Sequence, residues 1–315
     1  MTDHIILEHN TNGMKIVFMG TPDFAVASLD ALVQANFDIV AVVTAPDKPA
    51  GRGQKINESA VKKYAVEKSI PVLQPEKLKN PEFLAALKSY QADLQVVVAF
   101  RMLPEVVWNM PPKGTINLHG SLLPQYRGAA PINHAIINGE KESGVTTFFL
   151  THEIDTGDII LSDSTPIGDD ETAGELHDKL MVIGANLLVK TVTAISNGDF
   201  TEQPQPQSDE LKHAPKIFKD DCKIDWNNSS ALIHNLIRGL SPYPTAFTLL
   251  NDKTLKIFKA EPEEKEPGIA TGGFLTDGKT YLKFATKDGF IKLLDIQFEG
   301  KKRMLIEDFL RGMRL

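Results

Sequence analysis

The stretch Asn117-Leu-His-Gly-Ser-Leu-Leu-Pro-Gln-Tyr-Arg-Gly-Ala-Ala-Pro131 begins as a predicted strand and continues as a polar turn. Alternation along the strand, from Thr115 to His119, should point Asn117 and His119 to the same face. A second stretch, from Val145 to Asp158, is an apolar strand that runs out into Asp155-Thr-Gly157. Open α/β sheets bind their ligands beyond the carboxyl ends of strands. We therefore expect one site that contains Asn117, His119 and Asp155.

The residues around these stretches predict an α/β domain with a mostly parallel sheet. Lys15 to Met19 is a predicted buried strand, followed by a helix over 24–34 and a second strand over 37–44. This order of elements is typical of a parallel sheet. Further strands are expected over 94–100, 145–150 and 158–164, and a long helix over 172–196. A dinucleotide loop at Gly20 is not expected, because Pro22 and Phe24 stand where the G-x-G-x-x-G spacing needs glycine.

A polar, proline-rich segment, Gln203-Pro-Gln-Pro-Gln207, predicts a stiff linker to a second domain. Beyond it we expect a helix from Ser230 to Gly239 and then several short strands separated by Asp-Gly turns. Short strands at this spacing favour a small barrel or sandwich. We therefore divide the chain into a catalytic domain over 14–202, a linker over 203–213 and a second domain over 214–315.

The composition of the 315 residues is that of a soluble globular protein, with 42% apolar and 24% charged residues. The single cysteine, Cys222, excludes an internal disulfide and fits a reducing cytoplasm. The longest apolar runs are too short to cross a bilayer, and residues 1–13 lack the apolar segment of a signal peptide. We therefore expect a cytoplasmic protein with no membrane partner.

The net charge of −7 is distributed unevenly along the chain. Residues 214–315 contain 17 Lys and Arg against 14 Asp and Glu, a net charge of +3, and residues 1–213 contain 17 against 27, a net charge of −10. A basic second domain on an acidic protein hints at a polyanionic partner. This asymmetry is weak support by itself, because a charge of +3 on a domain of this size is common.

A second basic feature is the loop from Pro46 to Lys55, which holds two prolines, two glycines and three cations. Loops of this composition are most often solvated connections. The functional alternative is an arm that meets phosphates, with Arg52 free to reach them between its flanking glycines.

The three polar residues at the predicted site suit acyl transfer to an amine without a protein nucleophile. An imidazole can take a proton from the attacking amine and return it to the leaving group. A side-chain amide can donate to the oxyanion, and a carboxylate can orient the imidazole. Ser121 lacks the G-x-S-x-G elbow of a nucleophile, and no other histidine pairs with His119 at metal-binding spacing, so no metal is expected. The alternative reading of a histidine beside an asparagine is purely structural.

The motif Asn117-Leu-His-Gly-Ser-Leu-Leu-Pro124 with the downstream Asp155-Thr-Gly157 resembles the signature of the folate-dependent formyltransferases. The resemblance extends over the chain from about residue 14 to its end. It also includes Met19-Gly-Thr-Pro-Asp-Phe-Ala25, the Pro46–Gly53 loop and Ile224-Asp-Trp226. It implies a Rossmann-like first domain and an OB-like β-barrel as the second domain.

The family member that the whole chain resembles formylates the α-amino group of methionine on initiator tRNA, with 10-formyltetrahydrofolate as co-substrate. By this resemblance Asn117 binds the formyl oxygen, His119 transfers protons, and Asp155 holds His119 or an ordered water. Ser121, Leu122, Leu123 and Pro124 line the folate site, Arg52 and Lys55 contact tRNA, and the basic second domain follows its phosphates. The protein is expected to be a monomer.

The resemblance has one departure and leaves several alternatives open. The family has a glycine-containing turn after the central strand, where this chain has the shorter Phe100-Arg-Met-Leu-Pro104, so Arg101 either faces the folate or solvent. A formyltransferase acting on an amino sugar nucleotide would share the three polar residues and an OB-like domain. A glycinamide formyltransferase would not need the second domain, and a formyltetrahydrofolate hydrolase would use water as acceptor. A non-catalytic tRNA- or folate-binding protein would not need all three polar residues.

Overall fold

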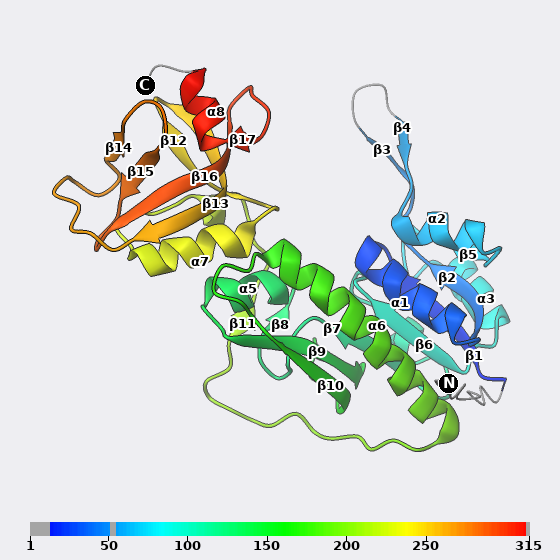
Figure 1. The fold of residues 1–315 in the computed structure, drawn as a ribbon. Coiled ribbons are helices and arrows are strands. Elements are labelled where there is room, and N and C mark those ends of the chain that lie inside the picture. Colours follow the sequence, from blue (N-terminus) through cyan, green and yellow to red (C-terminus); the bar gives the residue numbers. More distant parts are fainter. Residues whose placement is uncertain (1–12, 51–54, 313–315) are drawn as a thin grey trace, which may run out of the picture. The chain divides into compact units, whose positions relative to one another are not determined.

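The computed structural model describes residues 13–50 and 55–312 (Figure 1). Its contacts divide the chain into two compact units. The first contains residues 1–127, 144–164 and 178–211, and the second contains 128–143, 165–177 and 212–315. Each unit has its own sheet, so each is described separately.

The first unit is built on a seven-stranded sheet with the order β10-β9-β7-β6-β1-β2-β5. Strands β7, β6, β1, β2 and β5 are parallel, and β9 joins β7 in the antiparallel direction. The predicted mostly parallel sheet is therefore confirmed. The strands are β1 (Lys15–Gly20), β2 (Asp38–Val43), β5 (Val72–Leu73), β6 (Leu94–Val98), β7 (Thr115–His119), β9 (Glu142–Phe149) and β10 (Ile159–Pro166).

Helices cover both faces of this sheet (Figure 1). On one face, Val17 and Val97 pack with Phe83 of α3 and Val107 of α4 in one buried cluster. On the other face lies Leu118, which Gly184 of α6 approaches so closely that an added Cβ would meet it at 2.9 Å. The helices of this unit are α1 (Asp23–Gln34), α2 (Ala60–Glu67), α3 (Pro81–Ser89), α4 (Glu105–Trp108) and, from Asp178 onward, α6 (Ala173–Asn197).

Helix α6 is the one helix, among those in the described part of the chain, whose length and composition would suit a membrane span. Several of its apolar residues form part of the protein core, which accounts for the apolar composition of the helix. Leu176, Leu180, Leu188 and Val192 are completely buried. The Thr191 hydroxyl is also 2.8 Å from that of Thr147 on β9.

The Pro46–Lys55 segment, which was predicted to be a flexible loop, is partly a β-hairpin. Strands β3 (Lys48–Ala50) and β4 (Lys55–Asn57) pair in the antiparallel direction. At the base of the hairpin, Asp47 forms an ion pair with Lys62 and accepts a 2.8 Å hydrogen bond from Gln74. The hydrogen bond from Lys62 holds the pKa of the Asp47 carboxyl below its usual value, so the pair stays charged. The two partners of Asp47, Lys62 and Gln74, lie outside the predicted loop. The composition of the loop therefore could not predict these contacts.

The second unit contains an antiparallel sheet with the order β12-β13-β16-β15-β14, and β17 pairs with β16. One side of α7 buries Ile233, Ile237 and Leu240 in the same core as Trp226 and Phe284. This curled antiparallel sheet is consistent with the OB-like domain that was expected. The elements are β12 (Ala246–Leu250), β13 (Lys253–Glu263), β14 (Phe274–Thr276), β15 (Leu282–Ala285), β16 (Phe290–Phe298), β17 (Met304–Leu305), α7 (Ser230–Leu240) and α8 (Ile306–Arg311).

Several short elements were not predicted from the sequence. Helix α8 has six residues, which is too short for a helical period to stand out, and Phe309 and Leu310 bury it against β16. The other short elements that were not predicted are β8 (Arg127–Gly128), β11 (His213–Ala214) and the 3₁₀ helix η1 (Asp220–Cys222).

Helix α5 (Pro131–Ile137) was predicted, and it packs against α7 within the second unit. There Asn133 donates a 2.8 Å hydrogen bond to the carbonyl of Gly239.

Candidate functional site

Strand β7 places Asn117 and His119 on one face of the sheet, near its carboxyl end. Val97 pairs with Asn117 in the parallel register, so Asn117 lies on the face that α3 and α4 cover. Asn117 is half-buried at this end of the strand.

The imidazole of His119 is 7% exposed and has a fixed orientation. Its Nε2 lies 2.9 Å from the carbonyl oxygen of Tyr126. A carbonyl can only accept a hydrogen bond, so Nε2 carries the proton in the neutral ring. Nδ1 is then the basic nitrogen, and it faces the Asp155 carboxylate at 3.9 Å. This distance exceeds a hydrogen bond but lies within the range of an ion pair.

Asp155 is held in an unusual turn after β9. Its φ is +55°, a left-handed conformation that non-glycine residues adopt only occasionally. Two residues further on, a Cβ on Gly157 would lie 1.6 Å from the carbonyl oxygen of Phe149, so this position requires glycine. The hydroxyls of Thr151 and Thr156 are 3.1 Å apart across the turn. The structure thus brings Asp155 to His119, as the sequence predicted.

The segment from Ser121 to Pro124 follows β7 directly and is bound to β9 by hydrogen bonds. The Thr146 hydroxyl donates to the carbonyl of Ser121 at 2.7 Å and accepts from the amide of Leu123 at 3.1 Å. The buried hydroxyl of Ser121 donates to the carbonyl of Gln125 at 2.7 Å, which agrees with the absence of a nucleophile motif. Leu122 and Pro124, which follow His119 closely in the sequence, are half-buried and therefore keep part of their apolar surface accessible.

The two residues predicted to contact tRNA lie in or beside the β3–β4 hairpin. Lys55 begins β4. Arg52 lies outside the described residues, so the structure does not place it.

Arg101, which was expected to face either the folate or solvent, is half-buried and bound to a neighbouring segment. Its guanidinium turns back and donates to the carbonyls of Glu76, at 2.9 Å, and Pro75. It also lies over the ring of Phe100, at 5.4 Å from the ring centroid. Burial lowers the pKa of this guanidinium. Arg101 thus fastens the turn after β6 to the segment after β5, a contact that no sequence pattern predicts.

The structure adds three residues to the site that sequence reasoning missed: Tyr126, Arg127 and Gln205. Gln205 accepts from Arg127 and donates to the carbonyls of Asp155 and Gly157. Gln205 belongs to the predicted linker, and its proline neighbours gave no signal of a role in the site. Tyr126 and Arg127 were within the quoted motif, but Tyr126 acts through its backbone, which residue type does not reveal.

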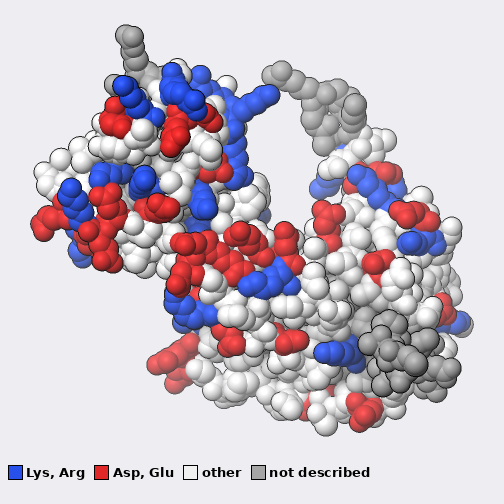
Figure 2. Space-filling view, in the orientation of Figure 1, with Lys and Arg blue, Asp and Glu red and all other residues white. Residues whose placement is uncertain are grey.

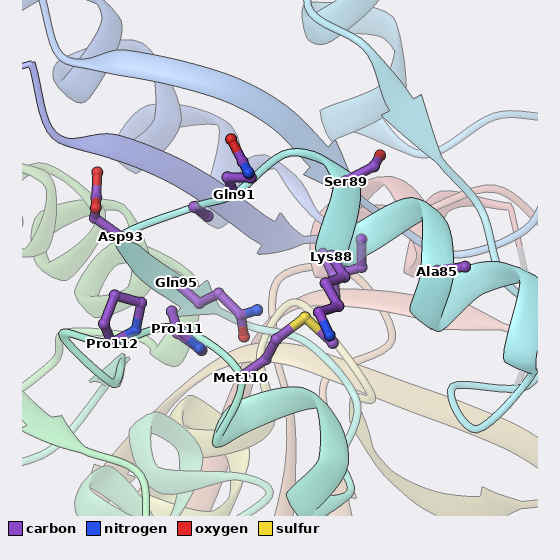
Figure 3. Close-up of a pocket in the computed structure, with 11 residues that line it drawn as sticks. Ala85, Lys88, Ser89, Gln91, Asp93, Gln95, Met110, Pro111 and Pro112 are labelled. Carbon is purple, nitrogen blue, oxygen red and sulfur yellow. The ribbon is translucent and has the colours of Figure 1, made fainter.

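Figure 3 shows a cavity of about 630 Å³ that does not belong to this site. It lies beside the amino ends of β6 and β7, where Gln95, Met110 and Lys88 point toward one another. The candidate site lies at the carboxyl ends of the same strands. In the described part of the chain, no three His, Cys, Asp or Glu side chains are placed to hold a metal ion.

Comparison with known proteins defines the class of this chain. Residues 14–192 match the formyl transferase family, and residues 216–314 match the C-terminal domain of formyl transferases. The chain therefore belongs to the formyl transferase family. It is 53% identical over 310 residues to the methionyl-tRNA formyltransferase of Bacteroides fragilis, and 55% identical over 311 residues to that of Parabacteroides distasonis. Each match covers 96% of both chains.

A solved structure shows the same fold at lower identity. It is the N-formyltransferase from Helicobacter canadensis, in complex with folinic acid and dTDP-3-aminofucose. The TM-score is 0.65 at 24% identity, and the match covers 89% of this chain and 98% of that chain.

Proposed function

We propose that this chain transfers the formyl group of 10-formyltetrahydrofolate to the α-amino group of methionine on initiator tRNA, for use in translation initiation. The observation that carries this proposal is the identity of 53–55%, over 96% of both chains, to proteins named methionyl-tRNA formyltransferase. The likeness to a sugar-nucleotide enzyme is at 24% identity and supports the fold alone.

In the proposed reaction, the methionine amine attacks the formyl carbon, and the bond from that carbon to N10 of the folate breaks. The half-buried amide of Asn117 donates to the formyl oxygen as it gains negative charge. Nδ1 of His119 takes the proton that the amine loses and delivers it to N10. Asp155 stabilises the imidazolium between these two transfers.

The folate co-substrate is proposed to bind beside the Ser121–Pro124 segment. The hydroxyl of Ser121 is already bound to Gln125, so Ser121 contributes shape and backbone rather than its hydroxyl. Leu122 and Pro124 are half-buried, Leu123 is buried, and Thr146 fixes the backbone of the segment. A rigid apolar wall of this kind suits a planar heterocycle.

We propose that tRNA is bound by Arg52 and Lys55 in the 46–55 segment and by a domain over 214–315, joined by a linker over 203–213. Figure 2 shows Lys and Arg gathered in the second unit where Figure 1 draws the turn between β16 and β17. The turn contains the exposed Lys301 and Lys302, and also Arg303, whose guanidinium is paired with Asp295. Exposed cations of this kind bind phosphates without reading sequence.

We further propose that the protein works as a monomer in the cytoplasm, without a membrane partner. Its single cysteine, Cys222, is buried, and burial raises the pKa of the thiol, so the thiol is kept unreactive. Leu176, Leu180, Leu188 and Val192 of α6 are completely buried in the core.

The test of this function compares acceptors at one concentration of 10-formyltetrahydrofolate. Purified protein is given methionyl-tRNA, a dTDP-amino sugar or no acceptor, and both the formylated product and tetrahydrofolate are measured. We expect formylation of the methionyl-tRNA only. Formylation of the sugar would contradict the proposed acceptor, and release of tetrahydrofolate without any acceptor would indicate a hydrolase.

A further inference from the structure

We infer that Gln205, in the segment that joins the two family-matched regions, is a positioning residue for the His119–Asp155 pair. The inference rests on the proposed function, because it names the residue that holds the proposed base and carboxylate in place. All contacts that carry it lie within the first unit.

The side-chain amide of Gln205 uses its full hydrogen-bonding capacity. Its Nε2 donates to the carbonyl of Asp155 at 2.8 Å and to that of Gly157 at 2.9 Å. Its Oε1 accepts from Nε of Arg127 at 3.1 Å and from Nη2 at 2.6 Å. Carbonyls only accept and a guanidinium only donates, so these partners fix which end of the amide is oxygen.

One half of this amide holds the turn that presents Asp155. The turn includes the left-handed backbone of Asp155 and the tightly confined Gly157, a conformation that costs free energy and persists only when its surroundings enforce it. Gln205 binds the carbonyl of each of these two residues. It therefore determines where the Asp155 carboxylate points relative to Nδ1 of His119.

The other half of the amide holds the segment on the opposite side of the imidazole. Arg127 directly follows Tyr126, whose carbonyl accepts the hydrogen bond from Nε2 of His119. Tyr126 is also left-handed, with a φ of +60°. Gln205 thus connects the two segments that face the two ring nitrogens of His119.

The backbone around Gln205 is itself fixed to the sheet. Gln203 and Ile159 exchange two backbone hydrogen bonds of 2.8 and 2.9 Å, and Ile159 begins β10 directly after the Asp155 turn. The proline-rich segment that was predicted to be only a linker therefore carries a residue of the site. This placement explains why Gln205 is half-buried while Gln203 and Gln207 are exposed.

Two substitutions separate the two halves of the amide. Gln205→Met keeps the length of the side chain and removes all four hydrogen bonds. Gln205→Glu keeps the acceptor for Arg127 but cannot donate to the two carbonyls, so it remains informative if Gln205→Met does not fold. Gln207→Met is the matched control, because Gln207 is exposed two residues further along the same segment.

The kinetic test is formylation of methionyl-tRNA by the full-length variants. We expect Gln205→Met and Gln205→Glu to lower kcat about 10- to 100-fold with little change in KM for either substrate, because misplaced groups lose rate rather than binding. Gln207→Met should match the wild type. In an Asp155→Asn background, Gln205→Glu should change kcat less than about twofold, because it keeps the acceptor for Arg127 and loses only the contacts to the Asp155 turn, so both substitutions act through one group. A full further loss in that background would overturn the inference.

A second readout does not need the proposed function to be right. The ¹⁵N spectrum of the His119 ring distinguishes the two neutral tautomers. Wild-type protein should show the proton on Nε2, and Gln205→Met should show a mixture, because the Tyr126 segment has lost its anchor. A variant that retains the pure Nε2–H tautomer and wild-type kcat would contradict the role of Gln205. If the tautomer changes but wild-type protein formylates no tRNA, the proposed function fails while the positioning role stands.

Discussion

The backbone carbonyl of Tyr126 decides which nitrogen of His119 can act as a base. The Nε2–H group donates a hydrogen bond to this carbonyl at 2.9 Å. Nδ1 is therefore the unprotonated nitrogen, and it faces Asp155. The residue types Asn, His and Asp, with their spacing, predicted that these groups would meet. The tautomer could not be predicted, because it depends on a backbone atom that no residue type specifies.

Replacing His119 with alanine tests the proposed proton transfer. We expect His119→Ala to lower kcat for formylation by about 100- to 10,000-fold, the usual contribution of a general acid–base. Affinity for tRNA should be unchanged, because no described contact links His119 to the basic residues. Binding measured by fluorescence anisotropy is the control, and an equal loss of tRNA binding would contradict the assigned role.

Replacing Ser121 with alanine separates a structural hydroxyl from a nucleophile. The hydroxyl is buried and donates to the carbonyl of Gln125. We expect Ser121→Ala to cost about 0.5–1.5 kcal/mol of unfolding free energy, because one part-buried hydrogen bond to the carbonyl of Gln125 is lost. The rate of formyl transfer should stay close to wild type. A loss of kcat by orders of magnitude in a folded variant would instead indicate a covalent mechanism.

At the scale of elements, the turn between β9 and β10 is the part of the site that the sequence predicted least well. Periodicity placed both strands and their connection. It did not reveal the left-handed Asp155 or the close contact between Gly157 and Phe149, because both depend on how the two strands come together. The β3–β4 hairpin was missed for the same reason. Its two strands pair with each other, and composition alone predicted a loop for most of these residues.

Gly157→Ala tests whether this turn shapes the site. An added Cβ would lie 1.6 Å from the carbonyl oxygen of Phe149, so the backbone must move. We expect a loss of about 1–3 kcal/mol in stability, as for other overpacked sites, together with a lower kcat because Asp155 shifts. Urea unfolding and formylation kinetics measure the two effects. A variant with wild-type stability and kcat would show that the turn tolerates this movement.

Helix α7 should make the second unit sensitive to acid through His234. Burial, and then the charge of Arg238, lower the pKa of His234 in the folded protein. The unfolded chain therefore binds this proton first as the pH falls, so stability is fully present above the unfolded pKa and is lost below it. We expect the second unit to be less stable at pH 5.5 than at pH 7.5, and His234→Gln to reduce this difference.

The measurement is urea unfolding followed by the fluorescence of Trp226, in a Trp108→Phe background so that the signal comes from the second unit. Both His234 and Trp226 lie in that unit. An unchanged pH dependence in His234→Gln would show that other groups are responsible.

At the scale of the whole molecule, the uneven distribution of charge agrees with an enzyme that acts on a polyanion. The net charge of +3 on residues 214–315 and the exposed cations between β16 and β17 are what phosphate contacts require. The order of elements and the two family-matched regions were predictable from the sequence. The division by contacts was not, because residues 128–143 and 165–177 pack with the second unit although they precede it in the chain.

The most direct test of the account is the rate of formyl transfer from 10-formyltetrahydrofolate to methionyl-tRNA at two salt concentrations. We predict that the protein formylates the tRNA and that kcat/KM for tRNA falls steeply as salt rises, because counterions compete for the phosphates. The KM for the folate should change much less. Formylation of methionyl-tRNA that does not depend on salt would contradict the proposed phosphate contacts. The absence of formylated methionine at either salt concentration would contradict the function itself.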